Sequence, residues 1–271
     1  MNNLNRLTHA TVETLNAPGN FYSTIQTAYH QASNNISNGN IVSKTDVGTY
    51  TYGGFPLHAV RNVTNAQNNI STLQQDITYT PFRKTASVEE NGFEQVFTYD
   101  PGYHRAKTTV LENGSPIRER YYWEGYEYQS DGTQLYYIPG GDGICAIIEY
   151  NHNTHLLPDI HYVYTDYLGS ILTVTDQAGN IEAEQNFDAW GRFRNPDDWT
   201  YSNIVANPSW LYRGYTGHEH MPEFTLINMN GRMYDPILGR MLAPDNYVSK
   251  SKRCITKVFC ERKRIWWLDI G

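Results

Sequence analysis

The sequence predicts a mostly β protein made of consecutive antiparallel hairpins, and three observations lead to this prediction. Tyr is abundant, with 22 residues, although the chain is polar, with a mean hydropathy of −0.59. Tyr favours strands because its ring can be buried while its hydroxyl stays in water. Tight-turn dipeptides recur along the chain, and short runs rich in Tyr, Thr, Val and Ile lie between them, as in hairpins. The dipeptides are Gly39-Asn40, Asn91-Gly92, Asn113-Gly114, Asp131-Gly132, Gly179-Asn180 and Asn230-Gly231.

In chain order, strands are expected within residues 45–52, 94–99, 117–128, 134–138, 161–165, 171–175 and 181–187. Helical signals are few. Residues 21–32 are compatible with about three helical turns that place Ile25, Ala28, Tyr29 and Ala32 on one side, but no cap bounds them. Residues 62–75 are rich in Asn and Gln and fit either a long loop or weak strands.

Composition argues against several functional classes. The formal charge of −7 divides into +5 for residues 249–271 and −12 for the other 248 residues, so the body of the chain is not suited to nucleic acid. No apolar run reaches the length of an integral membrane segment, and the first residues contain no signal peptide. The three cysteines, Cys145, Cys254 and Cys260, match neither a disulfide framework nor a zinc pattern. No cofactor and no metal is expected.

A repeated corner motif is the most informative local pattern. Residues 187–192 (Phe-Asp-Ala-Trp-Gly-Arg) and 234–240 (Tyr-Asp-Pro-Ile-Leu-Gly-Arg) share an aromatic residue, an Asp, a turn Gly and an Arg, and residues 99–102 and 164–169 are looser copies. The Asp is expected to accept hydrogen bonds from the turn backbone, and the Gly to adopt a positive φ. The predicted structural residues are Asp166, Gly169, Asp188, Gly191, Arg192, Gly231, Tyr234, Asp235, Pro236, Gly239 and Arg240.

These motifs resemble the YD repeats of bacterial Rhs proteins, and residues 164–248 resemble the Rhs repeat-associated core. The most specific stretch is 230–241 (Asn-Gly-Arg-Met-Tyr-Asp-Pro-Ile-Leu-Gly-Arg-Met), which leads to Pro244-Asp245. The resemblance implies a β-ribbon wound into a hollow shell around a C-terminal toxin, with the core closing one end. It divides the chain into a YD-repeat-like region (1–160), a repeat-associated core (161–248) and a divergent basic tail (249–271).

The resemblance also implies a possible self-cleavage site. Arg232 and Asp245 match the motif positions associated with aspartyl-protease-like cleavage in the family, a mechanism that needs two carboxylates. Relatives carry the partner Asp in an Asp-Pro-x-Gly motif, and residues 246–271 contain no such motif. The leading interpretation is therefore a non-catalytic structural protein, with Arg232 as a bidentate clamp on a turn carboxylate. A residual self-cleaving core is the alternative.

The basic tail leaves two interpretations open. It is either a frameshifted or prematurely ended reading frame, and so a truncated, disordered end, or a short variable tip, which at 23 residues is too small to fold alone. The expected partners are the rest of an Rhs shell, or its toxin cargo and export machinery, in a polymorphic-toxin system. The family is secreted or displayed at the cell surface; without a signal peptide, a fragment would be cytoplasmic.

Two further patterns each have a functional and a structural interpretation. His218-Glu219-His220 places two imidazoles on one face of a strand, which suits a metal, but no third ligand is evident and an ordinary polar strand or turn of the core motif is the preferred interpretation. The aromatic group Tyr121, Tyr122, Trp123, Tyr126 and Tyr128 is compatible with a glycan-binding surface, but cross-strand ring packing explains it more economically.

Overall fold

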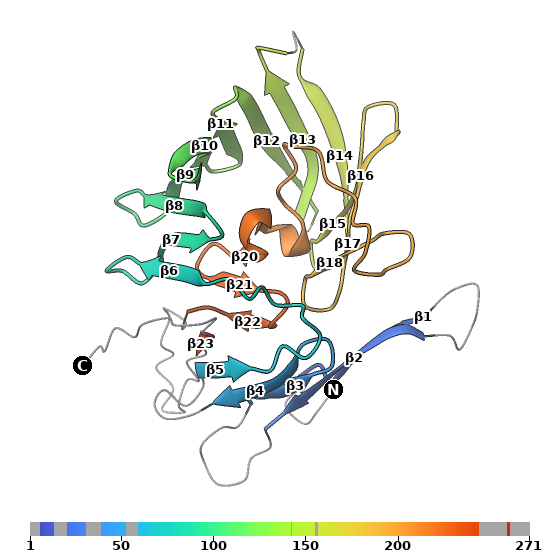
Figure 1. Cartoon of the computed structure of the whole chain (residues 1–271). Helices are drawn as coiled ribbons and strands as arrows, with labels where there is room; N and C mark the ends of the chain where they lie inside the picture. Colours follow the sequence, from blue (N-terminus) through green and yellow to red (C-terminus); the bar gives the residue numbers. More distant parts are fainter. Residues whose placement is uncertain are drawn as a thin grey trace.

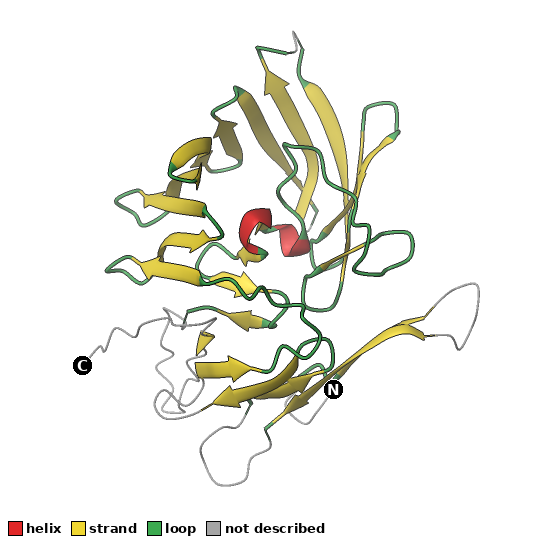
Figure 2. Ribbon diagram, in the orientation of Figure 1, coloured by secondary structure: helices red, strands yellow, loops and turns green. Residues whose placement is uncertain are grey.

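The computed structural model describes residues 6–13, 21–30, 39–52, 59–141, 143–154, 157–243 and 259–260. Within these residues the regular structure is almost entirely antiparallel β-sheet, and the helical turns are two short 3-10 elements, η1 (Tyr215–Gly217) and η2 (Pro222–Phe224) (Figure 2). The predicted mostly β class is confirmed. No helix in the described part of the chain is long and apolar enough to cross a membrane.

A six-stranded sheet is formed by the N-terminal strands, in the order β1-β2-β3-β4-β5-β23 (Figure 1). Its strands are β1 (His9–Glu13), β2 (Phe21–Tyr29), β3 (Ile41–Lys44), β4 (Gly48–Tyr52), β5 (Ala59–Val63) and β23 (Phe259–Cys260). β23 pairs in parallel with β5, whereas the other neighbours are antiparallel. This short strand is the described part of residues 249–271.

The helix considered for residues 21–32 is wrong over its described part. Residues 21–29 form β2, which pairs antiparallel with β1 and with β3. Ile25 and Thr27 are buried while Gln26 and Ala28 are exposed, which is the period of two of a strand. The strands on either side supply hydrogen-bond partners for the backbone of β2. This pairing stabilises the strand more than the weak helical tendency of an uncapped segment stabilises a helix.

An eleven-stranded sheet follows chain order from β6 to β16 without a crossover. Its strands are β6 (Gln75–Tyr79), β7 (Thr85–Glu90), β8 (Phe93–Tyr99), β9 (Arg105–Glu112), β10 (Ser115–Trp123), β11 (Tyr126–Gln129), β12 (Thr133–Gly140), β13 (Gly143–Asn151), β14 (Asp159–Thr165), β15 (Ile171–Thr175) and β16 (Ile181–Glu184). The strand order runs through residue 160 without a break, and the division expected there stays a prediction.

Two of the hairpins show how sequence sets the turns of this sheet. Asn91-Gly92 has φ values of 53° and 79°, and Asn113-Gly114 has φ values of 49° and 79°. Positive φ at both central residues matches the right-handed twist of the flanking strands, and Asn-Gly reaches it at low cost. Between β5 and β6, residues 64–74 form a loop in which the Asn65 side chain bonds the backbone N–H and C=O of Ile70 at 3.0 and 2.9 Å.

The remaining strands belong to a core segment, residues 186–243, which packs on one face of the long sheet. It contains β17 (Asn186–Phe187), β18 (Phe193–Arg194), β19 (Glu219–Met221), β20 (Leu226–Asn228), β21 (Met233–Asp235) and β22 (Arg240–Met241). Figure 1 shows the long sheet curving around η1, η2 and β20. One apolar cluster joins Val60 of the first sheet, Phe97 of the second and Leu238 of the core segment. A second packs Leu135 and Ile147 against Trp210.

Candidate functional site

The corner motifs form one recurring loop, which we call the Asp turn. At Asp188, the backbone N–H donates to the Arg192 carbonyl at 2.9 Å, and Gly191 N–H returns a bond to the Asp188 carbonyl at 3.0 Å. The Asp188 Oδ1 accepts from the backbone N–H of Trp190 and Arg192 at 2.7 and 3.0 Å. Gly191, the fourth residue of the loop, has φ +88°. One carboxylate oxygen therefore accepts hydrogen bonds from two backbone N–H groups that would have no backbone partner in this turn.

The same loop recurs at three further aspartates, each of which stands five residues before the first residue of the next strand. Asp166 Oδ1 accepts from Leu168 and Ser170 N–H at 2.9 and 2.8 Å, and Asp176 Oδ1 accepts from Ala178 and Asn180 N–H, both at 2.8 Å. A further copy stands at Asp100. The Asp176 copy was missed as a repeat because no aromatic residue precedes it. The spacing Asp-x-x-Gly-x is the signal that would have found it.

Asp235 makes a longer variant of the turn. Its Oδ1 accepts from the N–H groups of Ile237 and Leu238, both at 2.9 Å, and Gly239 N–H donates to its carbonyl at 2.8 Å. Gly239 has φ +65°, and a Cβ there would lie 2.6 Å from Cδ1 of Trp190. The Asp235 turn and the Asp188 turn are therefore packed directly on one another.

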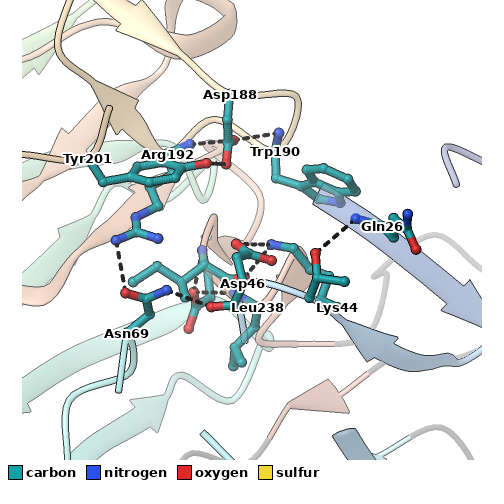
Figure 3. Close-up of polar contacts among 12 residues, drawn as sticks. Gln26, Lys44, Asp46, Asn69, Asp188, Trp190, Arg192, Tyr201 and Leu238 are labelled. Atoms are coloured by element: carbon teal, nitrogen blue, oxygen red, sulfur yellow. Dashed lines mark hydrogen bonds and ion pairs between the residues drawn. The ribbon is translucent and has the colours of Figure 1, made fainter. Parts of the chain in front are cut away.

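The first sheet and the loop that follows it hold these two turns through a group that we call the Lys44 cluster: Lys44, Asp46, Tyr50 and Asn69. Figure 3 labels Lys44, Asp46 and Asn69 beside the two turns. Lys44 is completely buried, and its Nζ donates to the Ile237 carbonyl at 2.6 Å and lies 3.3 Å from Asp46 Oδ2. The same ammonium lies 4.6 Å from the centroid of the Trp190 ring. A buried lysine needs this set of partners, because an unpaired buried charge is strongly destabilising.

Further contacts of the Lys44 cluster fix the backbone of the core segment. The Tyr50 hydroxyl donates to the Leu238 carbonyl at 3.0 Å. Asn69 donates to the Asp46 carbonyl at 2.6 Å and lies 3.4 Å from Nη2 of Arg192. On the Asp188 side, the Tyr201 hydroxyl donates to Oδ2 at 2.9 Å. Both oxygens of Asp188 thus have a structural function.

A second buried group, the Glu219 cluster, joins the core segment to the long sheet: Glu219, Arg105, Arg120 and Tyr122. Arg105 Nη1 lies 2.5 Å from Glu219 Oε2, Arg120 Nη1 donates to Oε1, and the Tyr122 hydroxyl donates to Oε1 at 3.0 Å. Burial raises the pKa of Glu219, but the guanidinium groups of Arg105, Arg120 and Arg213 outweigh it and lower the pKa to about 2. Glu219 is therefore ionised at neutral pH.

Two more ion pairs extend this contact along the sheet. Arg213 Nη2 donates to Glu127 Oε1 at 2.5 Å, and Arg118 Nη2 donates to Glu223 Oε1 at 2.7 Å. Across the interface, the sheet supplies Arg105, Arg118, Arg120 and Glu127, and the core segment supplies Arg213, Glu219 and Glu223. The sheet side, with three arginines and one glutamate, thus meets a core segment that contributes two glutamates and one arginine. Charge complementarity of this kind selects one docked arrangement more than it adds stability.

Comparison with known proteins agrees with this architecture. The family model described as the Teneurin YD-shell matches residues 142–259. Two crystal structures, of TcdB2-TccC3-Cdc42 and TcdB2-TccC3-TEV, each superpose with a TM-score of 0.57 over 82% of this chain, at 15% and 16% identity. Residues 142–259, less than half of the chain, are therefore similar to a YD-repeat shell. A third structure, TcdB2-TccC3, gives a TM-score of 0.51 over 89% of the chain at 13% identity. The chain spans only 12% to 17% of the length of the chains in those structures.

The structure describes only one of the two cleavage residues that the resemblance implies. Arg232 follows the turn between β20 and β21 and is half-buried; its carbonyl accepts from Met229 N–H at 3.0 Å. Asp245 lies outside the described residues. Self-cleavage therefore stays a prediction, as does the clamp function of Arg232.

The other motif residues lie close to the two turns. Gly231 does not need its conformational freedom, because Asn230 carries the positive φ of 58°. Tyr234 lies on β21, where burial raises the pKa of its hydroxyl. Pro236 is buried inside the Asp235 turn, and the Arg240 guanidinium lies 5.9 Å from the Tyr52 ring centroid.

The His218-Glu219-His220 triplet makes protein contacts. Glu219 belongs to its arginine cluster, and His220 Nε2 accepts from Tyr215 N–H at 3.0 Å. Burial, with the neighbouring His218, lowers the pKa of His220 to about 3, so the ring is neutral. His218 Nδ1 lies 2.8 Å from Thr216 Oγ1. Within the described ranges, no three His, Cys, Asp or Glu side chains are grouped so as to hold a metal ion.

Proposed function

We propose that this chain forms part of the wall of a YD-repeat shell that encloses a polypeptide cargo, and that its core segment closes the wall from inside. The shell architecture is the structural role that the fold supports, and cargo enclosure is the further step. One observation carries the proposal of cargo enclosure: the long sheet curves around the core segment and holds that segment through buried apolar and charged contacts on its inner face.

The chemistry of the inner face supports this proposal. The side facing the core segment carries buried arginines and glutamates together with apolar residues such as Leu135 and Ile147. A wall of mixed character can surround chain segments of varied composition, whereas a purely apolar wall would favour collapse onto itself. The cargo, by this proposal, is a toxin polypeptide of a secreted or surface-displayed bacterial polymorphic-toxin system, with the rest of the shell and the export machinery as partners.

Enclosure can be tested with a protease-sensitive reporter. An unfolded peptide fused after residue 271 should be digested several-fold more slowly than the same peptide fused to an unrelated folded domain, because enclosure limits protease access. A Glu219→Gln variant, which weakens docking of the core segment, should reduce the protection. Circular dichroism reports whether its sheets persist. Equal digestion of all three fusions would contradict cargo enclosure and leave the shell fold standing.

A further inference from the structure

The outer face of the long sheet carries a line of aromatic rings, which we call the aromatic row: Tyr121, Trp123, Tyr126, Tyr128 and Tyr136. These residues alternate along β10, β11 and β12 with buried residues such as Arg120, Glu127 and Leu135, which face the core segment. The row is therefore on the side away from the interior. Trp123 is 60% exposed and Tyr136 is 42% exposed.

The row runs across the strands, because its members are direct cross-strand partners. Trp123 is opposite Tyr126, and Tyr126 is opposite Tyr136. The ring centroids lie 5.4 Å apart in the first pair and 4.7 Å apart in the second. Tyr121 and Tyr128 form a second cross-strand pair alongside, with ring centroids 6.1 Å apart. The rings thus form a platform over three adjacent strands.

Contacts within the sheet hold the platform in place without a ligand. The hydroxyls of Tyr126 and Tyr136 both donate to Oε1 of Gln134, at 3.2 and 3.3 Å. The Tyr121 hydroxyl donates to Glu119 Oε2 at 3.0 Å, and the ring of Tyr121 is also stacked with Trp123. Side chains that are already ordered lose little conformational entropy when a ligand binds, which favours affinity.

Charge restricts what can bind here. The row itself consists of Tyr and Trp and contains no acidic or basic side chain, and the charges at its border, Lys107 and Glu119, pair with each other at 2.6 Å. Residues outside the basic tail sum to −12, which disfavours nucleic acids and anionic lipid surfaces. Protein interfaces typically add arginine anchors to their aromatic residues, and the row has none.

We propose that the aromatic row binds a neutral oligosaccharide lying across β10–β12. The flat face of a pyranose presents C–H groups with partial positive charge, which are attracted to the negative face of an aromatic ring. The hydroxyl groups of the sugar can form hydrogen bonds with the tyrosine hydroxyls and with the Gln134 amide at the edges of the rings. This site is on the outer face and is independent of what the interior encloses.

The test is titration of the purified chain with neutral hexasaccharides, namely those of cellulose, starch, xylan and chitin, with heparin and polygalacturonate as charged comparisons. At least one neutral sugar should bind. Trp123→Ala and Tyr136→Ala should each weaken that binding about tenfold or more, a loss of the size expected for one stacked ring. Trp123→Phe should retain most of the affinity, because it keeps a ring in place.

Tyr164→Ala is the matched control. Tyr164 is 57% exposed on the outer face of β14, outside the row, and its loss should leave the affinity unchanged. Thermal unfolding of each variant excludes misfolding. The proposal is overturned if no neutral sugar binds at millimolar concentration, if Trp123→Ala binds as well as the unaltered chain, or if the row substitutions change only self-association in sedimentation velocity.

Discussion

Glu219→Gln tests whether the charged contact between the core segment and the long sheet stabilises the fold. The Glu219 side chain is 5% exposed and contacts two arginines that are themselves almost completely buried. An uncharged amide would remove the carboxylate that pairs directly with Arg105 and Arg120, and Glu127 would remain as the buried carboxylate that acts on both guanidinium groups. Removing one partner of a buried ion pair typically costs about 3–5 kcal/mol.

The pKa of Glu219 gives an independent magnitude. The arginines outweigh the effect of burial and lower it from 4.5 to about 2. At about 1.4 kcal/mol per pKa unit, ionised Glu219 contributes about 3 kcal/mol at neutral pH. Because the folded-state pKa is the lower one, this contribution is fully present above pH 4.5 and is lost as the pH falls towards 2.

The assay is urea unfolding followed by Trp fluorescence, at pH 7 and at several pH values down to 3. We expect Glu219→Gln to lower the free energy of unfolding by about 3 kcal/mol at pH 7, with a smaller difference from the unaltered chain at pH 3. Glu184→Gln, a change at an exposed glutamate on β16, is the matched control. A loss at pH 7 no larger than that of Glu184→Gln would refute the reasoning.

Three other predictions concern single contacts. Gly239→Ala should destabilise more than Gly169→Ala in thermal unfolding: both introduce a side chain at positive φ, at about 1 kcal/mol, but only the former places a Cβ against Trp190. Asp188→Ala should lower the free energy of unfolding by about 1–3 kcal/mol in chemical denaturation, because it removes the acceptor of three hydrogen bonds. A loss below about 0.5 kcal/mol would contradict this. Burial lowers the pKa of His161, but the neighbouring carboxylates of Glu149 and Glu182 outweigh it and the net shift is upward. The stability that protonated His161 contributes to the fold should be fully present below the pKa of the unfolded state and disappear as the pH rises through the pKa of the folded state. His161→Gln should abolish this loss of stability with rising pH in denaturation measured at several pH values.

Local chemistry explains which parts of the fold were predictable. Asn91-Gly92 and Asn113-Gly114 set their turns within two residues, and the Asp188 loop closes through bonds that span four. Such interactions depend on neighbours in sequence, so a pattern reveals them. β2 was less predictable, because its spacing also fits a helix and the strands that pair with it decide the outcome.

The buried polar clusters were not predictable in the same way. Lys44 and Ile237 are 193 residues apart, and Arg120 and Glu219 are 99 apart, yet each pair is in direct contact. Nothing in the local sequence of Lys44 distinguishes it from an exposed strand lysine. The triplet 218–220 drew attention to its histidines, whereas Glu219 makes the ion pairs with the sheet.

By itself, the sequence determined a ribbon of antiparallel hairpins with Asp-closed corners, since turn geometry and strand alternation are encoded within a few residues. The tertiary structure alone decided which face of that ribbon is inside, which charges lose their water there, and which rings stay exposed outside. Burial and ion pairing depend on chain segments brought together only when the long sheet curves around the core segment, and no short-range pattern specifies that arrangement.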